Sequence, residues 1–252
     1  MNNRCAWMLA LATSLVFPMQ VQAETKACAQ PKAGRYVVME RGVIGTEPTA
    51  RLIQERWMPN GRIEGIVFER TGQDSRRENY IGTYQVQSNC QALVQRQLSS
   101  TTESTISVLN PNGEPVFGLA TQPQTVISSR WFPQGPETCQ ASELDGVVLS
   151  RQRGLSWDGS RWQPNAVIQR EVWDNGAVRG EAISSYDGRQ EQASYTGDIK
   201  TQADCWARLI ETDSKGVDYN YNAVLLTGGR GYIYLQDDAT DLTLGLLERV
   251  SR

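Results

Sequence analysis

The sequence predicts an all-β protein made of two tandem, antiparallel, eight-stranded up-and-down barrels that arose by internal duplication. A shift of 115 residues places residues 53–92 on residues 168–207 without a gap. The shared residues are mainly those that determine backbone geometry: Asn60-Gly61 and Asn175-Gly176, Gly65 and Gly180, Tyr80 and Tyr195, Gly82 and Gly197, Cys90 and Cys205. Residues 217–223 alternate apolar and polar side chains, which is the period of a half-buried strand.

Turn signals divide each half into about eight expected strands. In the first half we expect strands near residues 35–40, 51–58, 62–69, 78–87, 91–98, 104–110, 115–120 and 125–132. In the second half we expect them near residues 146–152, 166–173, 177–185, 193–200, 205–212, 217–226, 231–236 and 241–250. The hairpin-length connections favour closure into barrels, with a β-sandwich as the alternative.

The expected division of the chain is a signal peptide at 1–23, a first barrel at 24–131, a linker at 132–138 and a second barrel at 139–252. Arg4, the apolar run 6–17 and the small residues at 21–23 are typical of a cleaved signal. Two prolines favour the linker, because proline cannot donate a ladder hydrogen bond. We therefore expect an exported protein, periplasmic or extracellular, with no transmembrane segment after signal removal.

Four cysteines follow the expected cleavage site, and an even number in an exported chain indicates disulfides. Each half has one cysteine at its start and another about sixty residues later. Of the three possible connectivities we therefore expect Cys28–Cys90 and Cys139–Cys205. Loss of Arg4 with the signal leaves a net charge of −4, which argues against nucleic acid as a partner.

The chain has no histidine, which excludes Ser-His-Asp and Cys-His catalysis and the imidazole metal ligands. We predict no catalytic residue, no metal site and no cofactor, and we expect a protein that is not an enzyme. A hydrolase or isomerase that uses carboxylates, lysine or tyrosine is the remaining alternative. A locally basic patch is formed by Arg151, Arg153, Arg161 and Arg170, and it suits an acidic partner or a ligand carboxylate.

Short motifs are similar to those of a known family. Gly34-Arg35-Tyr36 resembles the Gly-x-Trp start of lipocalins and related calycins, with tyrosine in place of tryptophan. The stretches 80–90 and 195–205 are similar to exported bacterial lipocalin-like domains. The resemblance implies tandem lipocalin-like barrels and binding of a small apolar molecule.

The expected function is binding of a small apolar or aromatic molecule. The alternative is an interaction or assembly module with filled barrels, whose partner is a protein of the cell envelope. The candidate ligand-binding residues are Tyr219, Tyr221, Trp157, Trp162 and Trp173, because aromatic side chains form binding hot spots. A role as core anchors is the competing interpretation. The matching strand of the first half carries Ile106 and Val108 instead, so we expect the site in the second half.

Overall fold

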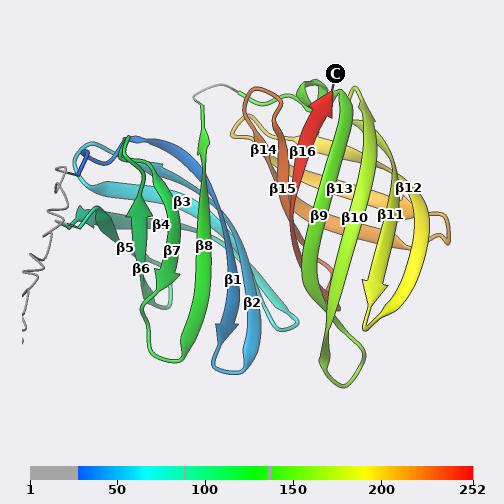
Figure 1. The fold of residues 1–252 in the computed structure, drawn as a ribbon, viewed down its shortest axis with the longest axis horizontal. Helices are drawn as coiled ribbons and strands as arrows, with labels where there is room; N and C mark the ends of the chain where they lie inside the picture. Colours follow the sequence, from blue (N-terminus) through cyan, green and yellow to red (C-terminus); the bar gives the residue numbers. More distant parts are fainter. Residues whose placement is uncertain (1–27, 88, 136–137, 252) are drawn as a thin grey trace, which may run out of the picture.

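The computed structural model describes residues 28–87, 89–135 and 138–251. They form two closed antiparallel barrels placed side by side (Figure 1). In each barrel every strand pairs with its neighbours in sequence, and the last strand closes on the first. The predicted fold class, two tandem eight-stranded up-and-down barrels, is confirmed. The predicted signal peptide lies outside the described residues, and no described helix is long and apolar enough to cross a membrane.

The strands agree closely with the expected segments. The first barrel consists of β1 (Gly34–Ile44), β2 (Glu47–Trp57), β3 (Arg62–Thr71), β4 (Asp74–Val86), β5 (Gln91–Gln97), β6 (Thr102–Leu109), β7 (Pro115–Ala120) and β8 (Thr125–Gln134). A 3-10 helix, η1 (Ala141–Leu144), precedes the second barrel. The second barrel consists of β9 (Gly146–Trp157), β10 (Trp162–Asp174), β11 (Ala177–Tyr186), β12 (Arg189–Thr201), β13 (Trp206–Asp213), β14 (Asp218–Leu226), β15 (Gly231–Gln236) and β16 (Asp241–Ser251).

A glycine opposite a tyrosine explains part of the sequence repeat. Gly65 pairs with Tyr80 across β3 and β4, and Gly180 pairs with Tyr195 across β11 and β12. A Cβ atom on Gly65 would lie 2.6 Å from the Tyr80 ring, and one on Gly180 would lie 2.2 Å from the Tyr195 ring. Only glycine leaves room for the tyrosine ring to cross the neighbouring strand inside each barrel.

The repeat register changes by one residue at the first hairpin of each barrel. Trp57 pairs with Gly34 and Ile63, whereas Trp173 pairs with Gly146 and Val178. Equivalent positions are therefore 116 residues apart on β2 and β10, and 115 apart on the strands that follow. The gap-free register expected from residue 53 is wrong. The second barrel has a two-residue turn with positive φ at Asn175 and Gly176, and the first barrel has the longer loop 58–61.

Both expected disulfides are present. The Cα atoms of Cys28 and Cys90 are 5.0 Å apart, and those of Cys139 and Cys205 are 4.9 Å apart. Each disulfide joins a cysteine that precedes the first strand of its barrel to the cysteine directly before the fifth strand. In the chain-entropy account, closing a loop of this length contributes about 4 kcal/mol to stability.

The outer face of β2 packs against the second barrel, so this strand is buried on both faces. Ala50 and Leu52 belong to the same apolar cluster as Ile233 and Leu235 of β15. Thr49, Arg51 and the other alternate residues point into the first barrel instead. The two barrels therefore share a continuous apolar contact.

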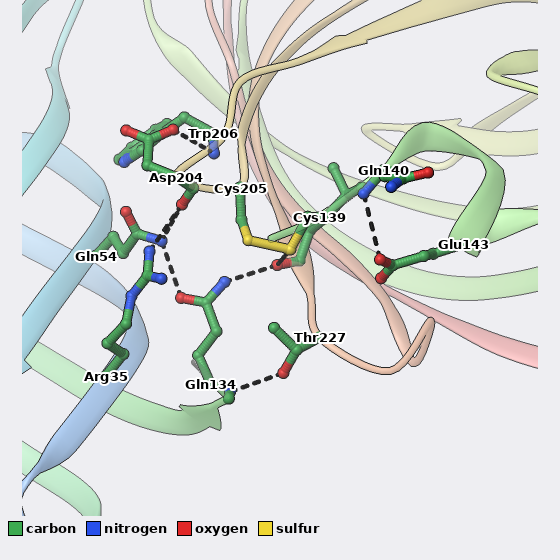
Figure 2. The surroundings of a disulfide bond; sticks show 12 residues. Arg35, Gln54, Gln134, Cys139, Gln140, Glu143, Asp204, Cys205, Trp206 and Thr227 are labelled. Carbon is green, nitrogen blue, oxygen red and sulfur yellow. Dashed lines mark hydrogen bonds between the residues drawn. A yellow bond between two sulfur atoms is a disulfide. The ribbon is translucent and has the colours of Figure 1, made fainter. Parts of the chain in front are cut away.

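Side chains of the first barrel also donate hydrogen bonds to carbonyl groups of the second. Gln54 Nε2 lies 2.6 Å from the Asp204 carbonyl oxygen, and Gln134 Nε2 lies 2.9 Å from that of Leu225 (Figure 2). These contacts surround the Cys139–Cys205 disulfide (Figure 2). They hold the start of β13 and the end of β14 against β2 and β8.

Strand β8 continues through Phe132, Pro133 and Gln134, which lie in the segment expected to be the linker. The proline was expected to exclude this segment from a ladder. β7 pairs with β8 only from Ser128 to Arg130, so Pro133 lies where β8 has lost one of its two neighbours. A proline is tolerated there because its missing N–H faces the unpaired side.

Candidate functional site

A groove of about 1330 Å³ lies between the barrels. Its walls come from β1, β5, β6, β7 and β8 of the first barrel and from β9 and β16 of the second. The apolar part is formed by exposed side chains on the outer faces of the strands, among them Val108, Phe117, Leu119 and Leu149. Phe117 is 56% exposed and Leu119 is 62% exposed. Large apolar side chains exposed together indicate a surface that binds another molecule.

The alternation of the strands explains why these side chains point outward. A Cβ atom on Gly118 would lie 2.8 Å from the Trp131 ring, which places Gly118 on the inner face of β7. Its neighbours Phe117 and Leu119 consequently face the groove. On β6, Thr105 and Ser107 are buried inside the barrel. Ile106 and Val108 therefore point outward and line the groove.

The polar part of the groove is positively charged. Four arginines line it, Arg41, Arg130, Arg151 and Arg153, together with one carboxylate, Glu248. Within the described ranges none of the four forms an ion pair. Arg41 Nη2 donates to the Leu244 carbonyl oxygen at 2.8 Å, and the Arg130 guanidinium lies 4.6 Å from the centre of the Phe132 ring. The groove thus combines an apolar wall with uncompensated guanidinium groups.

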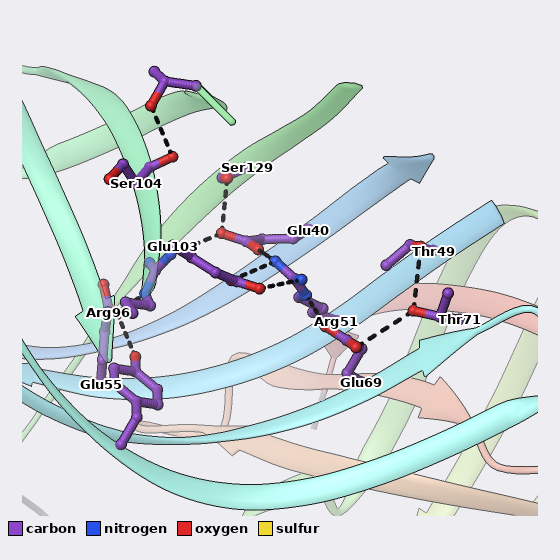
Figure 3. Close-up of polar contacts among 12 residues, drawn as sticks. Glu40, Thr49, Arg51, Glu55, Glu69, Thr71, Arg96, Glu103, Ser104 and Ser129 are labelled. Carbon is purple, nitrogen blue, oxygen red and sulfur yellow. Dashed lines mark hydrogen bonds and ion pairs between the residues drawn. The ribbon is translucent and has the colours of Figure 1, made fainter. Parts of the chain in front are cut away.

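The interior of the first barrel holds a compensated network of buried charges (Figure 3). Arg96 donates to Glu55 at 2.9 Å and to Glu40 at 3.1 Å. Glu55 also accepts hydrogen bonds from Tyr80 Oη at 2.6 Å and Trp131 Nε1 at 2.7 Å. Burial alone would raise the pKa of Glu55, but the Arg96 charge and these donors hold it below its ordinary value of 4.5.

A second arginine extends this network toward β6. Arg51 donates to Glu103 at 2.6 and 2.8 Å and to Glu40 at 3.3 Å, and it also pairs with Glu69 (Figure 3). Burial raises the pKa of Glu103 despite the opposing charge of Arg51. These side chains give the first barrel an interior with paired charges.

The second barrel repeats the carboxylate but not the cation. Glu171 accepts hydrogen bonds from Trp173 Nε1 at 2.7 Å, Tyr195 Oη at 3.0 Å and Tyr232 Oη at 2.9 Å. This arrangement matches that of Glu55 with Trp57 and Tyr80. Burial raises the pKa of Glu171 to about 7.

Glu211 occupies the position that corresponds to Arg96. Arg96 pairs with Gly82, and Glu211 pairs with Gly197, which is the repeat of Gly82. Glu211 is 3% exposed, and its Oε1 atom has no hydrogen-bond partner among the described residues. Burial, together with the charge of Glu171, raises its pKa well above the ordinary value.

Other charged positions of the first interior are neutral in the second. The strand pairings place Gln152 where the first barrel has Glu40, Val167 where it has Arg51, and Tyr219 where it has Glu103. The result is a cavity of about 70 Å³ whose lining, among the described residues, contains no lysine or arginine. The tyrosine and carboxylate side chains of the lining include Tyr195, Tyr219, Tyr221, Tyr234, Glu211, Asp213 and Asp241.

The structure brings Tyr219 and Tyr221 together in the wall of this cavity. The Tyr221 ring lies 4.6 Å from that of Tyr234, and Tyr219 Oη donates to Asp213 at 3.3 Å. Trp173 is buried against the Tyr232 ring. Its ring does not line the cavity or the groove.

Trp157 and Trp162 lie elsewhere, at the β9–β10 hairpin. Their rings contact each other edge to face at 5.5 Å, and they line neither the cavity nor the groove. The prediction that Ile106 and Val108 correspond to Tyr219 and Tyr221 is wrong, because the Ile106 and Val108 side chains point outward into the groove. The true counterparts of Tyr219 and Tyr221 are Glu103 and Thr105.

Sequence reasoning missed both the groove and the buried carboxylate pair, although a signal for each was present. Arg151 and Arg153 of the predicted basic patch do line the groove, whereas Arg161 and Arg170 do not. The shift of 115 residues already places Arg96 on Glu211. A reversal of charge at a repeat position is visible in the sequence, but its burial is not.

Neither a protein-family model nor a curated protein matches the chain. Among solved structures, a candidate AttH from Nitrosomonas europaea is 9% identical, with a TM-score of 0.30 over 95% of this chain and 97% of that one. A protein of unknown function from the DUF3598 family of Nostoc punctiforme is 12% identical, with a TM-score of 0.26 over 86% and 96%. A porin-like protein from Bacteroides uniformis is 10% identical, with a TM-score of 0.24 over 90% and 100%. The fold assignment therefore depends on the strand pairing of this chain.

Proposed function

We propose that the protein binds an elongated amphiphile, an apolar molecule with one acidic group, in the groove between its barrels. The observation that carries the proposal is the groove itself, about 1330 Å³ in volume with an apolar wall beside unpaired arginines. Sites for small molecules typically have volumes of about 300–1,000 Å³. The 70 Å³ cavity of the second barrel is too small for such a ligand, and the interior of the first barrel holds buried ion pairs that an apolar ligand would have to displace.

The two parts of the groove would contribute differently to binding. Phe117 and Leu119 are exposed, and burying a large apolar side chain contributes about 1.5–3 kcal/mol. The guanidinium groups of Arg151 and Arg153 would hold the acidic group, since arginine binds carboxylate and phosphate through two parallel hydrogen bonds. Apolar contact would thus supply most of the affinity and the arginines would supply orientation.

The test uses a fluorescent polyene fatty acid and the uncharged alcohol of the same chain. The double variant Phe117→Ser/Leu119→Ser should weaken binding of both probes by at least about tenfold. The double variant Arg151→Ala/Arg153→Ala should weaken binding of the acid more than binding of the alcohol. Ile183→Ser removes another exposed apolar side chain, on β11 and outside the groove, and serves as the matched control. Equal affinities in the control and in both groove variants would contradict the proposal.

The alternative is an interaction module of the cell envelope with filled barrels, and the buried ion pairs inside the first barrel favour it. A protein partner would require the same exposed side chains on β7 but not a free groove. If the wild-type protein binds neither probe, the amphiphile proposal fails and the interaction module takes its place.

A further inference from the structure

Each barrel buries a carboxylate on its second strand, but the two barrels place side chains of opposite charge beside it. In the first, the Arg96 guanidinium lies between Glu55 and Glu40, within 6.0 Å of the Tyr80 ring centre and 5.8 Å of the Trp131 ring centre. In the second, the equivalents of Glu55 and Tyr80 are retained as Glu171 and Tyr195, but a carboxylate replaces the cation. The first barrel thus carries, as its own side chain, a cation that the second barrel lacks.

We propose that the second barrel binds a small organic cation, an ammonium or guanidinium group, between Glu211 and the tyrosines of its cavity. This site is separate from the groove between the barrels. Among the described residues, none lines both of them. The bound cation would occupy the role that Arg96 plays in the first barrel.

The unpaired oxygen of Glu211 is the observation that points to a ligand. Glu211 lines the cavity, is 3% exposed, and has no hydrogen-bond partner on Oε1 among the described residues. The Glu211 carboxyl group has a side-chain hydrogen bond with Tyr221, so it is the Oε1 oxygen that is left without a donor. A buried polar atom without a partner is costly, and buried charges are normally paired. The N–H groups of an ammonium or guanidinium would supply the missing donor.

The rest of the cavity wall suits the same chemistry. Tyr195, Tyr221 and Tyr234 line the cavity together with Glu211, and aromatic faces attract cations. Asp213 and Asp241 add further carboxylates, and among the described residues the lining has no lysine or arginine to compete. An anion would meet only like charge there.

The size of the cavity restricts the ligand. About 70 Å³ is available, and a water molecule in the liquid takes up about 30 Å³. A head group of a few non-hydrogen atoms therefore fits, and a long hydrocarbon does not. Tyr186, Asp213 and Tyr219 are only half-buried at the cavity wall, so a short tail has a way out toward solvent.

The experiment measures binding of methylammonium and guanidinium ions to the full-length protein by calorimetry, at about pH 8, where more carboxylate is ionised. We expect saturable binding of at least one of them and no binding of acetate. Glu211→Gln keeps the side chain's shape and removes its charge, and it should weaken binding at least about tenfold. Glu181→Gln is the matched control, because Glu181 is an exposed carboxylate on β11 of the same barrel that does not line the cavity.

A second variant keeps the test decisive if Glu211→Gln does not fold. Glu211→Arg recreates the arrangement of the first barrel, so its own guanidinium should occupy the site and abolish binding. Absence of saturable binding of either ion to the wild-type protein would overturn the proposal, as would equal affinity in Glu211→Gln and Glu181→Gln. Comparing butylammonium with N-acetyl-lysine-N-methylamide then distinguishes a free amine from a lysine side chain of a partner, and binding of either supports the site.

Discussion

Arg96 and Glu211 occupy equivalent positions in the two barrels and carry opposite charges. Both are buried on the fifth strand of their barrel, opposite a glycine that the repeat conserves. Around Arg96 the interior is a paired network, and around Glu211 it is a cavity lined by tyrosines. The duplication kept the architecture and reversed the electrostatics of one interior, so the two barrels should respond differently to the same perturbation.

The first prediction concerns pH. The pKa of Glu171 is about 7 in the folded protein and 4.5 ordinarily, so the folded barrel binds this proton more tightly than the unfolded chain does. Its contribution to stability is complete below about pH 4.5 and is lost as pH rises through about 7. Glu171→Gln should therefore gain stability relative to wild type between about pH 5 and pH 8, on the order of 2 kcal/mol.

Urea unfolding of the wild type and of Glu171→Gln, at about pH 5 and about pH 8, measures this difference in the free energy of unfolding. Glu181→Gln, at an exposed position, is the control. Glu55 should show the opposite sign, because its folded pKa lies below 4.5 and its contribution is lost as pH falls through that folded value. If the stabilities of the wild type and of Glu171→Gln change in parallel with pH, the pKa of Glu171 is not raised in the folded protein.

The second prediction compares removal of each equivalent charge. Arg96→Met leaves Glu55 buried without its cation and removes one of the two arginines that pair with Glu40, which should cost about 3–5 kcal/mol. Glu211→Gln removes a buried carboxyl that has an unpaired oxygen and should be neutral or stabilising. The free energies of unfolding of the two variants, measured at neutral pH without added amines, check this asymmetry. A similar loss in both variants would contradict it.

The third prediction tests the glycine–tyrosine pairs. Gly180→Ala places a methyl group 2.2 Å from the Tyr195 ring, and Gly65→Ala places one 2.6 Å from the Tyr80 ring. Each ring must move, and overpacking of this kind costs about 1–3 kcal/mol. Gly34→Ala is the matched control, since its methyl group would have no neighbour closer than 3.8 Å. Thermal unfolding should separate the first two variants from the third, and equal midpoints would refute the account of the repeat.

Much of the fold could be predicted from the sequence because the repeat constrains it. The turn glycines, the strand alternation and the cysteine spacing all depend on local geometry, and the disulfides Cys28–Cys90 and Cys139–Cys205 followed from that spacing. The one-residue change of register at the first hairpin was missed, because Asn-Gly occurs at both turns although the loops differ in length.

The sites were less predictable because they depend on contacts between distant strands. The alternation of β14 indicates that Tyr219 and Tyr221 share a face, and both line the cavity. The size of that cavity depends on Glu211, Tyr195 and Tyr234 from other strands. The groove requires the two barrels to be positioned side by side, and no local pattern encodes that. In the sequence, Phe117 and Leu119 are ordinary strand residues. The structure shows that their outward side chains border the groove shared with the second barrel.

The most direct test of the central claim is to locate the bound amphiphile. A long-chain fatty acid with a photoreactive diazirine in its tail is crosslinked to the full-length protein, and the labelled peptides are identified by mass spectrometry. Binding in the groove predicts labels on β7 (Pro115–Ala120) and β9 (Gly146–Trp157), reduced in Phe117→Ser/Leu119→Ser and unchanged in Ile183→Ser. Labels confined to the inward residues of β14 (Asp218–Leu226) and β15 (Gly231–Gln236) would place the ligand inside the second barrel and contradict the account.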